Sequence, residues 1–94
     1  MISADELKLI EKVSLLLVGI YNQLLVINIQ EPPEIKKVRN VIMNKDVKGF
    51  SSIRENLYKG FRRLDEMGVN DNIIDGLSSQ LYLLVKDNAV FNKI

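Results

Sequence analysis

The chain contains no cysteine and no histidine among its 94 residues. Without cysteine it can form neither a disulfide framework nor a thiolate metal site, so we expect a cytoplasmic domain rather than a small secreted one. Without histidine it lacks the commonest general base, the usual hydrolase triad and most zinc sites. Carboxylate or lysine chemistry remains open, but an enzyme is the least expected class, and we predict no catalytic, metal-binding or cofactor-binding residue.

A secretory leader and a convincing membrane span are also missing. The first six residues are acidic rather than basic, unlike a signal peptide. The longest uncharged run, residues 13–30, is interrupted by Ser14, Asn22, Gln23 and Asn28. A membrane helix requires about 20 mainly apolar residues, so this run is a poor span. We therefore expect a cytoplasmic protein that lies at most peripherally at the inner face of the membrane.

Hydrophobic spacing indicates that residues 1–94 form a single helical domain. Apolar residues recur at intervals of three and four, which predicts helices over about residues 4–28, 33–45, 52–67 and 71–88. Two Ser-x-x-Glu capping boxes, at residues 3–6 and 52–55, mark the starts of the first and third helices, and Asn70 or Asp71 is expected to cap the fourth. Pro32 and Pro33 end the first helix and begin the second. Because short connections favour antiparallel neighbours, we predict an all-α, antiparallel up-down four-helix bundle.

Four glycines have structural interpretations. Gly19, Gly60 and Gly76 lie inside predicted helices, where glycine costs about 1 kcal/mol against alanine. We attribute them to close approach between helices. Gly68 follows the third helix, where a left-handed cap is expected.

Positive charge is concentrated in the middle of the chain. Residues 34–63 carry nine basic and three acidic side chains, a net charge of +6, although the whole chain carries only +1. This segment, with Lys59, Arg62 and Arg63 as its candidate basic surface, could contact an anionic membrane, nucleic acid or an acidic protein. Alternatively, it is a solvated face that the acidic first and fourth helices partly neutralise. A DNA-binding helix-turn-helix over residues 33–67 is disfavoured, because the loop at 45–51 exceeds the three or four residues typical of that motif.

The last residues extend beyond the regular apolar stripe of the fourth helix. Phe91 and Ile94 are the apolar members of this tail. The tail either folds back on the bundle or offers an apolar contact to a partner, and single exposed apolar residues are common enough that both alternatives stay open.

Four segments together resemble a known family. They are Ile20-Tyr-Asn-Gln-Leu24 late in the first helix, Pro33-Glu-Ile-Lys-Lys-Val-Arg39 opening the second, Ile53-Arg-Glu-Asn-Leu57 in the third, and Ile74-Asp-Gly-Leu-Ser-Ser-Gln-Leu-Tyr82 in the fourth. Over roughly residues 4–88 the chain resembles the immunity proteins of class IIa (pediocin-like) bacteriocins, of the enterocin A immunity type. The chain departs from that family in its short second helix and in lacking a long C-terminal extension.

The resemblance implies an interaction protein that protects a producer cell from its own pore-forming peptide. Such a protein would act from the cytoplasmic side on a membrane receptor, a mannose phosphotransferase permease, when the bacteriocin is bound. Specificity in the family is associated with the C-terminal half. By position this implies the partner-binding candidates Lys86, Asn88, Phe91, Asn92 and Lys93. A nucleic-acid-binding regulator and a generic helical adaptor remain the alternatives.

Overall fold

Helices account for most of the computed structural model of the chain, which describes residues 3–88 and residue 91. The elements are α1 (Ala4–Val26), α2 (Pro33–Met43), the 3₁₀ helix η1 (Val47–Ser52), α3 (Ile53–Glu66) and α4 (Asn72–Asp87). The described residues include no strand. The predicted all-α class is confirmed.

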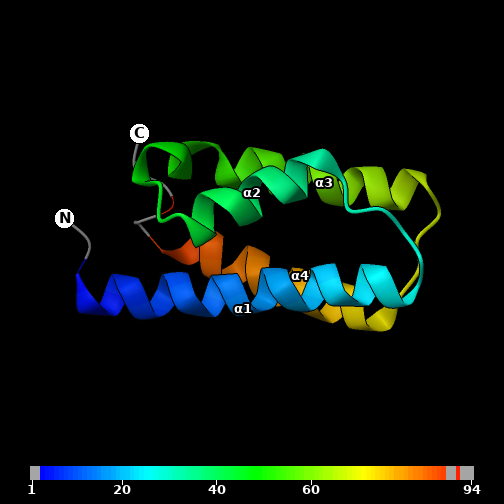
Figure 1. Ribbon diagram of the computed structural model, residues 1–94, viewed down its shortest axis with the longest axis horizontal. Coiled ribbons are helices and arrows are strands. Elements are labelled where there is room, and N and C mark those ends of the chain that lie inside the picture. Colours follow the sequence, from blue (N-terminus) through cyan, green and yellow to red (C-terminus); the bar gives the residue numbers. More distant parts are fainter. Residues whose placement is uncertain (1–2, 89–90, 92–94) are drawn as a thin grey trace.

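The four helices run alternately up and down along the 39 Å long axis of the molecule (Figure 1). α1 packs mainly against α4, and α2 packs mainly against α3. The α1–α2 and α3–α4 connections lie at one end of the bundle, whereas η1 joins α2 to α3 at the other end (Figure 1). The predicted antiparallel up-down bundle is therefore confirmed.

The starts of the helices follow the predicted caps in two cases out of three. The Ser3 hydroxyl accepts a hydrogen bond from the Glu6 backbone N–H at 3.1 Å, and Glu6 accepts one from the Ser3 backbone N–H. Asp71 caps α4 by accepting from the Ile74 N–H at 3.0 Å. The second capping box is wrong. The chain enters α3 through η1, so Ser52 is already near helical angles and its hydroxyl donates to the Gly49 carbonyl instead.

The first two helices end two residues earlier than predicted. Asn28 and Lys45 adopt left-handed φ angles of 59° and 51°, which an α-helix cannot continue through. At the end of α1, the Ile29 N–H then donates to the Leu24 carbonyl at 2.8 Å. Gly68 has a φ of 76°, so its predicted left-handed conformation is confirmed.

All four helices contribute to one continuous apolar core, which η1 and the tail complete. The buried side chains are Ile10, Val13, Leu17, Ile20 and Leu24 of α1; Ile35, Val38 and Ile42 of α2; Phe50 of η1; Ile53, Leu57 and Leu64 of α3; Ile74, Leu81 and Val85 of α4; and Phe91. Of the two isoleucines that begin the apolar pattern of the fourth helix, Ile74 is buried and Ile73 is 57% exposed.

Close helix approach explains two of the three internal glycines. A Cβ on Gly60 would overlap the side chain of Ile35 on α2, and one on Gly19 would lie 3.2 Å from Leu77 on α4. Nothing lies within 4 Å of the Cβ position of Gly76, so the close-approach interpretation is wrong there.

Candidate partner-binding surfaces

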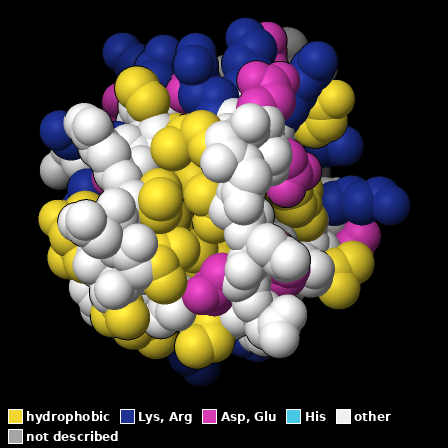
Figure 2. Space-filling model, turned by 90° about the vertical axis from the view of Figure 1, so that its right-hand side faces the viewer, with side chains coloured by type: hydrophobic (Ala, Val, Ile, Leu, Met, Phe, Trp, Pro, Cys, Tyr) yellow, Lys and Arg dark blue, Asp and Glu magenta, His cyan; other side chains and the backbone are white. Residues whose placement is uncertain are grey.

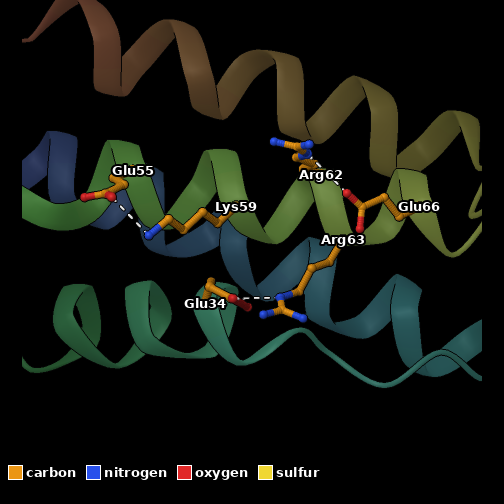
Figure 3. Close-up of polar contacts among 6 residues, drawn as sticks. All are labelled: Glu34, Glu55, Lys59, Arg62, Arg63 and Glu66. Carbon is orange, nitrogen blue, oxygen red and sulfur yellow. Dashed lines mark hydrogen bonds and ion pairs between the residues drawn. The ribbon is translucent and has the colours of Figure 1, made fainter.

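The three candidate basic residues, Lys59, Arg62 and Arg63, lie on the exposed side of α3 (Figure 3). Together with Glu34 of α2 and Glu66 of α3 they line a shallow cavity of about 240 Å³. Arg63 reaches down to α2, whereas Arg62 points away from it (Figure 3). The structure therefore brings the three cations to one region but does not aim them at a common point.

Each of these cations has a carboxylate partner. Lys59 Nζ lies 3.0 Å from Glu55, Arg62 Nε lies 3.1 Å from Glu66, and Arg63 Nε lies 2.7 Å from Glu34. The first two pairs are one helical turn apart, a spacing that is visible in the sequence. The acids of α2 and α3 themselves neutralise much of this surface. In the solvated-face alternative, that role was assigned to the acidic first and fourth helices.

The pair between Glu34 and Arg63 joins two helices and could not be found from the sequence. The Glu34 side chain is 16% exposed, and the hydrogen bond from Arg63 is the main cause that lowers its carboxyl pKa. Its second oxygen, Oε1, is buried and has no hydrogen-bond partner among the described residues. Glu34 therefore holds Arg63 against α2, which removes this arginine from the free positive surface.

The C-terminal candidates divide into three groups. Lys86 is exposed in the last turn of α4, and the Asn88 side chain donates to the Leu84 carbonyl at 2.7 Å. Phe91 is 1% exposed and packs on Phe50 of η1 with ring centroids 5.5 Å apart. Of the two alternatives for this residue, the structure has it folded back into the core, where it offers no exposed contact. Asn92 and Lys93 lie outside the described residues.

The corner between α1 and α2 contains a polar cluster that sequence reasoning missed. Arg39 donates from Nε and Nη2 to the two carboxylate oxygens of Glu31, at 3.1 and 2.9 Å. The Arg39 and Glu31 side chains are only 17% and 6% exposed. The guanidinium carbon lies 4.5 Å from the ring centroid of Tyr21, within cation–π range. The bond to Glu31 raises the Arg39 pKa, so the guanidinium remains charged.

Apolar side chains are exposed at the end of the bundle where α1 meets α2 and α3 meets α4. Figure 2 shows them gathered in the middle of this end, with Lys and Arg side chains along the upper edge. Leu25, Val26, Met67 and Ile73 are each more than half exposed here. Only a minority of the most apolar stretch of α1 is buried, and by length and composition alone α1 could cross a membrane, a test that core helices of soluble proteins also pass.

No family model, curated protein or solved structure matches the chain. Among the described residues, no group of three or more acidic, histidine or cysteine side chains is placed to hold a metal ion. Function must therefore be inferred from the residues and their geometry.

Proposed function

We propose that this chain is a bacteriocin immunity protein of the class IIa type. It would protect the cell that makes it by acting, from the cytoplasmic side, on a mannose phosphotransferase permease that has bound the pore-forming peptide. The protein would work as a binding partner and would need no cofactor. Its cytoplasmic location, and any peripheral contact with the anionic inner leaflet, belong to the same proposal.

The observation that carries the proposal is the α1–α2 corner. The resemblance depends mainly on two segments, residues 20–24 and 33–39. They lie in different helices, so the apolar spacing of a single amphipathic helix does not by itself explain why both are present. They meet in space through Tyr21 and Arg39, and Glu31 completes the cluster. A shared packing interaction thus supports the resemblance beyond a common pattern of apolar residues. The antiparallel four-helix bundle agrees with the fold that the resemblance implies.

Expression in a sensitive lactic acid bacterium tests the proposal. We expect survival to rise when the cells are challenged with at least one member of a panel of class IIa peptides, and to stay unchanged with a pore-forming peptide of another class. Cells that carry the empty vector provide the baseline. Equal killing of both strains across the whole class IIa panel, with the protein shown to be present and folded, would rule the proposal out.

Replacing Lys86, one of the C-terminal candidates, tests whether the C-terminal half determines which peptides the protein protects against. Lys86→Gln should narrow or shift the range of peptides against which cells survive, whereas Lys8→Gln, an equivalent loss of charge at an exposed position of α1, should not. Equal effects of both substitutions would contradict the assignment to the C-terminal half.

The nucleic-acid-binding alternative has less support, because Lys59, Arg62 and Arg63 are each paired with a carboxylate. A salt-dependent gel shift of duplex DNA that is lost in an Arg62→Gln/Arg63→Gln variant would revive it. A generic helical adaptor remains the interpretation if neither immunity nor DNA binding is observed.

A further inference from the structure

Two cavities lie one after the other between α1 and α2. The larger, about 390 Å³, has Leu15 of α1 and Met43 of α2 on its walls and Lys45 at its edge. The smaller, about 240 Å³, has Leu25 of α1 and Lys36 of α2 among its lining residues. We call the surface that contains both cavities the α1–α2 groove. The α2 residues that line it are Lys36 and Arg39 at the smaller cavity, and Ile42 and Met43 at the larger.

Each cavity of the groove has exposed apolar side chains among its lining residues. Leu15 is 74% exposed, Leu25 is 59% exposed and Met43 is 47% exposed. The floor of the larger cavity is formed by the core residues Ile10 and Ile42, and that of the smaller by Leu24. A partner seated here would bury leucine and methionine side chains against residues that are already fixed by the core, so little extra ordering of the groove is needed.

Charge at the groove favours an acidic partner. Lys36 lines the smaller cavity and Lys45 lines the larger, and neither forms an ion pair within the part of the chain that the structure describes. The acid at the smaller cavity, Glu31, is 6% exposed and neutralised by Arg39. Glu11 is the remaining acid on the walls. The groove thus presents exposed apolar side chains with two available ammonium groups, which complement carboxylates on an incoming surface.

The shape of the groove favours a helix over a flat membrane surface. The α1 residues that line the two cavities are centred about eleven positions apart, which is about 16 Å along a helix. Residues i and i+11 of a partner helix project from one face at that same separation. A bilayer surface has no side chains that could fill two separate hollows. We propose that the α1–α2 groove binds an amphipathic helix of a partner protein, with apolar anchors three turns apart and carboxylates beside them.

This inference does not depend on bacteriocin immunity, and it can be tested without a known partner. The probe is a synthetic amphipathic helix with leucines one, two and three turns apart on one face and glutamates flanking them. A second peptide has lysines in place of the glutamates, and a third has the acidic composition in scrambled order. Binding of each to the full chain is measured by calorimetry, and the contact surface is mapped by amide chemical-shift changes.

We expect the acidic helix to bind at least tenfold more tightly than the lysine or scrambled peptides, with shifts concentrated along the groove. The variant Lys36→Glu/Lys45→Glu should reverse the preference between the acidic and lysine peptides, and Leu15→Ser should weaken the binding of both. Leu83→Ser, at an exposed leucine of α4 that lines neither cavity, should leave binding unchanged. Circular dichroism melts confirm that every variant remains folded.

Three results would overturn the inference. The first is equal binding of the acidic and scrambled peptides, and the second is chemical-shift changes that map outside the groove. The third is binding to vesicles of phosphatidylglycerol and phosphatidylcholine that depends on Leu15 and Met43, with no binding of any peptide, which would make the groove a membrane-contact surface. Immunity could succeed or fail in each of these cases, so the two proposals are judged separately.

Discussion

At the scale of single residues, replacing Arg39 by an apolar side chain of similar length should lower the free energy of unfolding considerably. An Arg39→Met variant leaves the Glu31 carboxylate, which is 6% exposed, without its bidentate partner. Breaking a buried pair in this way costs about 3 kcal/mol. For a domain of this size we expect the melting temperature to fall by roughly 10 °C or more, as measured by circular dichroism.

A matched control distinguishes the effect of breaking a buried ion pair from the effect of losing a positive charge. Lys59→Met also removes a cation from an ion pair, but Lys59 and Glu55 are 55% and 69% exposed. Exposed pairs contribute about 0–1 kcal/mol, so this variant should melt close to the wild-type protein. Equal losses in the two variants would show that the Arg39–Glu31 pair gains nothing from its burial.

Two glycines inside helices provide a paired prediction with opposite signs. Gly60→Ala would force a Cβ against Ile35 of α2, whose backbone nitrogen lies only 3.3 Å from that position, so we expect a loss of about 2 kcal/mol. Gly76→Ala places a Cβ in open space at an exposed position of α4 and should stabilise the protein by about 0.5–1 kcal/mol. Urea denaturation measures both, and stabilisation by Gly60→Ala would contradict the close contact between α2 and α3.

At the scale of whole elements, Phe91 joins the region beyond α4 to η1. Phe91 packs on Phe50, and its backbone N–H donates to the Asn88 carbonyl. Phe91→Ala should therefore destabilise the fold by about 3 kcal/mol, as truncation of a buried phenylalanine does. Amide chemical shifts should change mainly in η1 and at the end of α4. A variant with native stability and unchanged η1 signals would instead mean that Phe91 is free for a partner.

The sequence predicts the helices well where a local signal is strong, and less well where tertiary contacts decide. Ser3 with Glu6, Asp71 and Gly68 carry their capping information within one turn, and all three were located correctly. Asn28 and Lys45 give weaker signals, because asparagine adopts the left-handed conformation only occasionally and lysine rarely does. The 3₁₀ helix η1 was not predicted either, and its Phe50 is buried in the core that distant helices form.

On the candidate surfaces too, contacts between residues close in the sequence could be predicted, whereas contacts between distant residues could not. The pairs of Lys59 with Glu55 and of Arg62 with Glu66 could be found from the spacing of four residues. The bonds from Arg63 to Glu34 and from Arg39 to Glu31 join residues 29 and 8 positions apart, and only the packed bundle brings them together. Counting charges along the chain therefore overestimated the free positive surface of the middle segment.

At the scale of the whole molecule, ion pairs decide how strongly the protein is attracted to anionic surfaces. Among the described residues, at least four of the nine basic side chains in the middle segment are held by carboxylates: Arg39, Lys59, Arg62 and Arg63. Long-range attraction depends on the local balance of charge, and it is screened beyond about 8 Å at physiological salt. The +6 of residues 34–63 already includes Glu34 and Glu55, so pairing with Glu31 and Glu66 from outside the segment lowers its net charge by two, to +4. The segment therefore stays basic, but less so than its own composition indicates.

This electrostatic account predicts that removing acids will create membrane affinity. In a Glu55→Gln/Glu66→Gln variant, Lys59 and Arg62 are released from exposed ion pairs, and each released cation should strengthen binding to an anionic bilayer by about 1 kcal/mol, or roughly fivefold. Sedimentation with vesicles containing phosphatidylglycerol measures the change, which should shrink as salt is raised. The control Asp75→Asn/Asp87→Asn alters net charge equally but on α4. Equal gains in both variants would show that overall charge governs attraction, and that the pairing of individual cations on α3 does not.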